Sequence, residues 1–148
     1  MLLSPFDHIP DNSNMAIVVS VFMLLGLLMS SPWVPPGLRM LRSKPGIVDV
    51  IASCLLLAGL WNSLWHGLRH LTDFWGVAAL VSGFLMIAVA ILLLVEHGSD
   101  SWRRQTVAVR AHSALKPLSS VLVVGLALSF GLYTIALVRL NLGLPIPG

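Results

Sequence analysis

Four long apolar stretches alternate with short polar segments along this chain. They cover residues 15–31, 47–68, 74–95 and 118–140. A helix of about 20 apolar residues crosses the roughly 30 Å hydrocarbon core of a bilayer, and the first stretch is near the lower limit of that length. The pattern predicts an all-α, integral membrane bundle of four transmembrane helices, which forms one domain over residues 1–148.

The connections carry the residues that stop and start helices. Prolines and Gly37 end the first stretch, Gly98 is expected to end the third, and Pro117 suits the first position of the fourth helix. Residues 69–73 form a tight connection in which Thr72 or Asp73 is placed to cap the third helix. A short basic segment on the membrane surface is expected at residues 38–44 within the loop 32–46, and a surface helix within the loop 96–117.

The basic residues predict an orientation. Lys and Arg gather on the cytoplasmic side of membrane proteins. The loops 32–46 and 96–117 hold seven of the nine, and Arg69 and Arg139 lie on the opposite side. We therefore expect both termini outside, facing the periplasm across a bacterial inner membrane.

Composition supports a membrane protein and excludes some partners. Hydrophobic residues make up 57% of the chain and charged residues 10%, against about 25% charged in soluble domains. The bilayer is thus the first partner, and the basic residues are topology signals rather than a nucleic-acid footprint. The single cysteine, Cys54, excludes an intrachain disulfide.

Residues 57–75 concentrate the polar chemistry of the chain, with three of its five tryptophans and two of its five histidines. At 100° per residue, one helical sector carries the polar side chains and should face protein or water. These are Asn62, His66, Arg69, His70 and Asp73. An adjoining sector carries Gly59, Ser63 and Gly67, and leucines occupy the far side.

Small residues at spacings of four predict close helix packing in the membrane. They occur in the second, third and fourth stretches, as Gly59, Ser63 and Gly67, as Ala79 and Gly83, and as Gly125 and Ser129.

The polar sector allows three interpretations. His66, His70 and Asp73, joined by His8 and with Asn62 in support, provide ligands that suit copper or zinc. We favour an interfacial belt instead, in which Trp61, Trp65 and Trp75 lie at headgroup level. The third interpretation is that Arg69 and the tryptophans contact a partner subunit or a lipid headgroup.

Other chemistry finds little support in the sequence. An intrachain bis-histidine haem needs facing histidines on two helices, and His97 and His112 are expected a bilayer away from His66. The spans lack the midplane carboxylate of an ion-coupled carrier, and their serines lack an adjacent base. We expect no catalytic activity of its own.

The sequence favours a small accessory subunit that stabilises or positions a larger membrane complex, of an energy-transducing or redox kind. The alternatives are a copper- or zinc-binding membrane protein with a site on the outer face, and a protein that binds lipid headgroups.

Overall fold

The computed structural model describes residues 12–31 and 34–143, and within these ranges every regular element is helical. The elements are α1 (Asn12–Ser30), α2 (Pro36–Arg42), α3 (Pro45–Trp61), η1 (Asn62–Gly67), η2 (Leu68–His70), α4 (Phe74–His97), α5 (Asp100–Arg103), α6 (Thr106–Leu115), η3 (Lys116–Leu118) and α7 (Ser119–Asn141).

Three helical stretches are long and apolar enough to cross a membrane. They run over Pro45–His70, Phe74–His97 and Thr106–Arg139, and α1 contributes a shorter apolar stretch, Ala16–Ser30. The chain is therefore an all-helical membrane protein.

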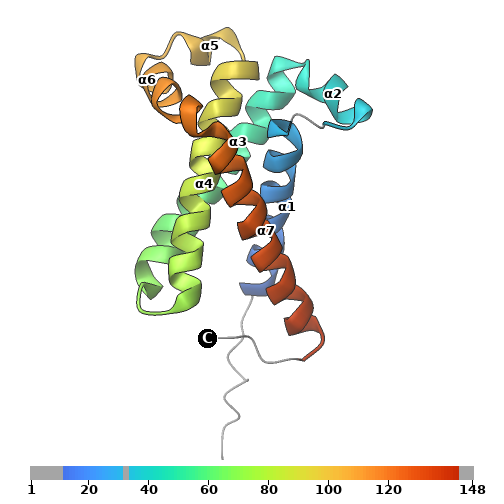
Figure 1. The fold of residues 1–148 in the computed structure, drawn as a ribbon, viewed down its shortest axis with the longest axis vertical. Coiled ribbons are helices and arrows are strands. Elements are labelled where there is room, and N and C mark those ends of the chain that lie inside the picture. The colour runs from blue at the N-terminus through green and yellow to red at the C-terminus, as the bar shows by residue number, and fades with distance from the viewer. Residues whose placement is uncertain (1–11, 32–33, 144–148) are drawn as a thin grey trace, which may run out of the picture.

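The helices pair along their lengths, with α3 packed on α4 and α1 beside α7 (Figure 1). The short helices α2, α5 and α6 lie together at one end of the molecule. The α3–α4 connection lies at the opposite end. Both basic loops therefore lie at the same end of the bundle.

The core is drawn from all four long helices. Met23, Leu55, Met86 and Leu126 come from α1, α3, α4 and α7 in turn, and each is fully buried. The helix α4 lies at the centre, since 56% of its most apolar window is buried, compared with 33% for α3 and 11% for α7.

The small residues of α3 and η1 meet those of α4. A Cβ added to Gly59 would lie 2.7 Å from the Gly83 carbonyl oxygen, and one added to Gly83 would clash with the Ser63 hydroxyl. Gly67 likewise meets the backbone of Leu80. On α7, a Cβ added to Gly125 would lie 3.2 Å from the side chain of Leu85. The backbones of α3 and α4 thus approach as closely as small residues allow.

Pro117 lies inside a helical stretch that runs continuously from Thr106 to Arg139, whereas the sequence predicted a helix start there. The stretch tightens into the 3₁₀ turn η3 at this point. Such a turn accommodates the missing N–H of proline without ending the helix.

Gly98 ends α4, but for a different reason than the left-handed cap expected of a C-terminal glycine. Its φ is −76°, so any residue could adopt the backbone conformation. A Cβ there would clash with the Leu94 carbonyl and lie 2.6 Å from Asp49 Oδ1. That carboxylate accepts the Ser99 N–H at 3.0 Å, which ties α3 to the start of α5.

Polar side-chain contacts hold α6 against the C-terminal end of α4. Glu96 Oε1 accepts the Lys116 ammonium at 2.8 Å and lies 3.3 Å from His112 Nε2. Arg103 donates to the carbonyls of Val95 and Glu96 at 3.2 and 3.0 Å, which satisfies acceptors that the helix end leaves open.

Candidate functional site at the α3–α4 connection

The helix that begins at Pro45 changes its winding where the polar residues begin. Asn62–Gly67 form a π-helix, followed by a 3₁₀ turn over Leu68–His70. A π-helix bonds i to i+5, so each of its turns holds additional backbone. The 100° spacing that grouped the polar residues into one sector therefore fails beyond Trp61. The predicted sector divides into an inward, an end-facing and an outward part.

Asn62 is the inward part and is buried between α4 and α7. Its amide nitrogen lies 3.1 Å from the Ala79 carbonyl oxygen, 2.9 Å from Ser82 Oγ and 3.2 Å from Tyr133 Oη. Ser82 also donates to the Ala79 carbonyl at 3.1 Å. One side chain thus links three membrane-spanning segments in a low-dielectric interior, where such bonds strengthen one another.

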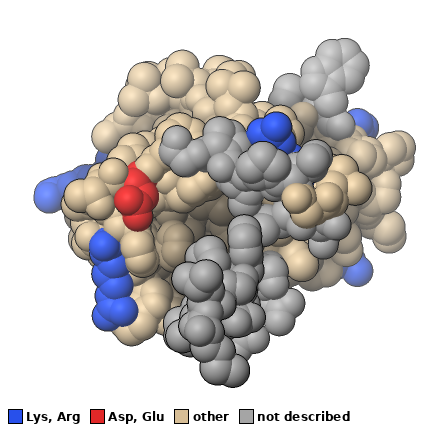
Figure 2. Space-filling view, turned by 90° about the horizontal axis from the view of Figure 1, so that it is seen from below, with Lys and Arg blue, Asp and Glu red and all other residues tan. Residues whose placement is uncertain are grey.

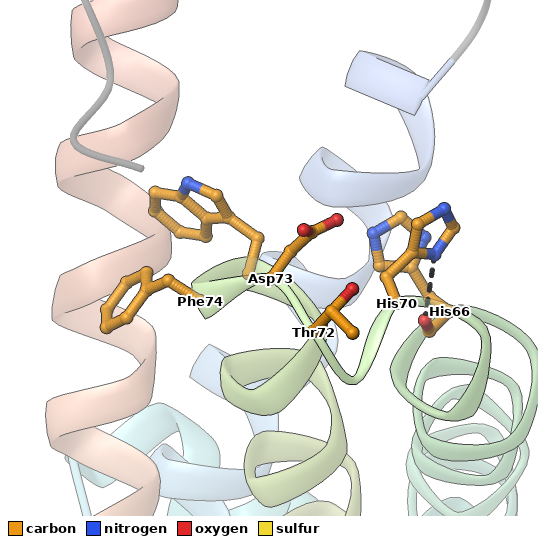
Figure 3. Close-up of a pocket in the computed structure, with 7 residues that line it drawn as sticks. His66, His70, Thr72, Asp73 and Phe74 are labelled. Carbon is orange, nitrogen blue, oxygen red and sulfur yellow. Dashed lines mark hydrogen bonds between the residues drawn. The ribbon is translucent and has the colours of Figure 1, made fainter.

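The end-facing part lines an open pocket of about 370 Å³ at the α3–α4 connection. Its polar side chains point to the same open side in Figure 3, and Phe74 with its neighbour forms the aromatic wall. The lining residues are His66, His70, Thr72, Asp73, Phe74, Trp75 and Gly76.

The two histidine rings lie close together on successive turns, tilted by 34° to each other. Their ring centroids are 5.0 Å apart, and His70 Nδ1 lies 3.1 Å from the His66 carbonyl oxygen. A carbonyl only accepts, so Nδ1 of His70 carries the proton in this bond. In the neutral ring, Nε2 of His70 is then a hydrogen-bond acceptor.

Asp73 holds the N-cap position of α4 in an extended conformation, as predicted, but its side chain makes no capping hydrogen bond. It also forms no ion pair within the described residues. The carboxylate is left available to the pocket. Gly76 makes this arrangement possible, because a Cβ there would clash with the His70 carbonyl.

The outward part consists of Arg69 and two tryptophans. The Arg69 guanidinium carbon lies 3.5 Å from the centroid of the Trp65 ring, and Trp65 stacks on Trp61 at 5.1 Å. Both rings are about half exposed. This stack has the amphipathic form of an interfacial belt, with the cation over the ring face.

The metal hypothesis gains no third ligand from the structure. Within residues 12–31 and 34–143, no three His, Cys, Asp or Glu side chains are grouped closely enough to hold an ion. His8 lies outside the described residues. The amide of Asn62 faces α4 and α7 rather than the pocket. The copper or zinc site stays a prediction.

No known protein family, curated protein or solved structure matches this chain.

A second, mostly apolar groove of about 280 Å³ lies between α4 and α7. Phe74 lines both hollows, so the pocket and the apolar groove lie next to each other. Trp75 packs edge-on against Tyr133, with ring centroids 6.4 Å apart, beside this junction. The groove is lined by Phe74, Val77, Ala78, Val81, Leu128, Ser129, Leu132 and Tyr133.

Seen from the end that carries the α3–α4 connection, the described surface is largely uncharged, with isolated acidic and basic side chains (Figure 2). An acidic patch and several basic side chains are visible there.

Sequence reasoning missed three residues of these sites: Ser82, Tyr133 and Gly76. Tyr133 is the only tyrosine of the chain and stands within an apolar stretch. A hydroxyl in that setting needs a partner, and this was the available signal. Nothing in the spacing identified Gly76, since the clash that requires it comes from the fold of η2.

Proposed function

We propose that this protein is a small accessory subunit that joins a larger membrane complex through the outer face of α7. The observation that carries the proposal is the low burial of α7. Only 11% of its apolar window is buried within the chain, against 56% for α4. A helix that packs on α1 and α4 with so few fully buried residues keeps one exposed face available to another membrane helix.

The outer face of α7 is suited to such a contact. Helices associate in lipid through packing, and small residues allow close approach. A Cβ at Gly131 would meet nothing within 4 Å, so this glycine has open space beside it at the middle of the face. The exposed apolar residues around it are Val121, Val124, Leu128, Ile135 and Val138.

The proposed subunit crosses the membrane four times with both termini outside. The apolar stretch of α1, Ala16–Ser30, extends over about 22 Å at 1.5 Å per residue, and the polar first residues of the helix continue it toward the headgroups. The gathering of both basic loops at one end supports a cytoplasmic position for that end. The bacterial inner membrane is the setting that this charge bias favours.

The experiment compares Gly131→Phe with a matched control, Val50→Phe. Val50 lies on the exposed face of α3, where its side chain is 64% exposed, so both changes place the same ring outside the bundle. The wild-type protein and the control are expected to leave the membrane in a heavier assembly by native mass spectrometry. Gly131→Phe should leave as a free, folded chain. Its ring occupies open space outside the bundle, so it blocks the partner contact without disturbing the packing of the chain itself.

Two results contradict the proposal. One is a wild-type chain that leaves gently solubilised native membranes alone. The other is an assembly that survives Gly131→Phe unchanged.

A further inference from the structure

The two hollows at the α3–α4 connection differ in chemistry but touch at Phe74. The outer pocket carries four polar side chains, and the apolar groove, which shares Phe74 with it, follows about two turns of α4, from Phe74 to Val81. A ligand that fills both needs a polar head and an apolar tail. The groove lies along two membrane-spanning segments, so such a ligand reaches it from the bilayer.

The polar groups of the pocket are rich in acceptors. Asp73 contributes an unpaired carboxylate, and His70 contributes Nε2 when its ring is neutral. The Thr72 hydroxyl lines the same pocket and also accepts (Figure 3). A group with several N–H donors and a positive charge complements this set.

The aromatic wall favours the same ligand. Phe74 and Trp75 stand edge to face at 5.4 Å and both line the pocket. Aromatic faces attract ammonium groups, and a carboxylate beside them adds a charge-assisted hydrogen bond. The nearby cation, Arg69, is stacked on Trp65 rather than paired with Asp73, so it leaves the carboxylate to a ligand.

We propose that this site binds one membrane phospholipid with a primary ammonium headgroup, as in phosphatidylethanolamine. The ammonium lies against Asp73, Thr72 and His70, and an acyl chain follows the groove between α4 and α7. This site shares Leu128 with the outer face of α7 but does not include Gly131, and it does not depend on the accessory role.

The first test uses the full-length protein, delipidated in detergent and mixed with defined phospholipids before native mass spectrometry. Dioleoyl phosphatidylethanolamine is expected to stay bound in preference to dioleoyl phosphatidylglycerol, which lacks the ammonium. The phosphatidylcholine analogue should bind more weakly as well, because its trimethylammonium group has no N–H to donate. Equal retention of the phosphatidylglycerol lipid would overturn the proposal.

Asp73→Asn removes the charge and keeps an N-cap residue of equal quality, so folding is preserved. It should weaken phosphatidylethanolamine binding about tenfold, as expected for the loss of a hydrogen bond to a charged group. The control, Asp100→Asn, changes an exposed carboxylate at the opposite end of the molecule and should leave binding unchanged. Undiminished binding in Asp73→Asn rules out this headgroup assignment.

Ala78→Phe tests the tail. Ala78 lines the groove and is partly exposed, so the ring occupies the groove without entering the core. Retention of dioleoyl phosphatidylethanolamine should fall at least about tenfold while the thermal unfolding of the protein stays the same. Glycerophosphoethanolamine, which has no acyl chains, should compete poorly. If glycerophosphoethanolamine competed as strongly as the lipid itself, the groove would be excluded from the site. Full lipid binding by Ala78→Phe would exclude it as well.

Discussion

At the scale of single residues, Asn62 has the largest consequences. Its amide has two protons and three acceptors within 3.2 Å, on Ala79, Ser82 and Tyr133. The Ser82 hydroxyl can in turn donate to the Ala79 carbonyl or to Tyr133 Oη, so the group is satisfied as a network rather than as separate pairs. This network fixes α7 to α4 and to the segment that follows α3.

The network makes a stability prediction. Asn62→Ala should lower the free energy of unfolding by about 2 kcal/mol and Tyr133→Phe by about 1 kcal/mol, the range of interhelical hydrogen bonds in membranes. The double variant should cost less than the sum of the two, because both changes remove the same bond. Reversible unfolding in mixed micelles measures all three.

Thr134→Val is the control for this series. The Thr134 hydroxyl bonds the Phe130 carbonyl of its own helix at 2.8 Å and is exposed, so its loss should change stability by less than about 0.5 kcal/mol. If the loss of unfolding free energy in the double variant equalled the sum of the losses in Asn62→Ala and Tyr133→Phe, the two side chains would not interact.

At the scale of elements, the contact between α3 and α4 depends on glycines that have no room for a side chain. Gly83→Ala would drive a methyl group into the Ser63 hydroxyl and to 2.6 Å from the Gly59 carbonyl oxygen. The two helices must then separate, and neighbouring contacts are lost along with this one. We expect a loss of about 2–3 kcal/mol in unfolding free energy.

The matched comparison is Gly131→Ala, which adds the same methyl group where nothing lies within 4 Å. Alanine is the better helix former by about 1 kcal/mol in the peptide scale, so this variant should be as stable as the wild type or more stable. If Gly83→Ala and Gly131→Ala had the same unfolding free energy in the same micelles, the close packing of α3 on α4 would not determine the stability of the protein.

At the scale of the whole molecule, the expected orientation separates two ends of the bundle. Cys54 is the only cysteine, so a Cys54→Ala background allows single reporters at Leu71 and at Arg104. Both positions are exposed, one beside the α3–α4 connection and the other between α5 and α6. A membrane-impermeant maleimide added to spheroplasts should label Leu71→Cys and leave Arg104→Cys unlabelled until the membrane is opened.

The reverse labelling would place the basic loops outside and refute the proposed topology. Labelling of both reporters in sealed spheroplasts would mean that the two ends share one side of the membrane, which the fold of the spans does not permit.

The sequence by itself determined the helical, membrane-embedded class, the places where helices change direction and the small residues of α3 and α4. Bilayer thickness and the spacing of glycines are local rules, readable from the order of residues. It also grouped His66, His70 and Asp73, which the structure places around one pocket.

Only the tertiary structure decided how the polar residues divide. The π-helix at Asn62–Gly67 turns Asn62 toward Ser82 and Tyr133, which are far away in sequence. A fixed 100° spacing cannot anticipate that change of winding, because the additional backbone is stabilised by contacts with α4 and α7 rather than by the local sequence. The contacts that require glycine at Gly76 and Gly98 and the groove beside Phe74 also depend on distant parts of the chain, so the sequence did not predict them.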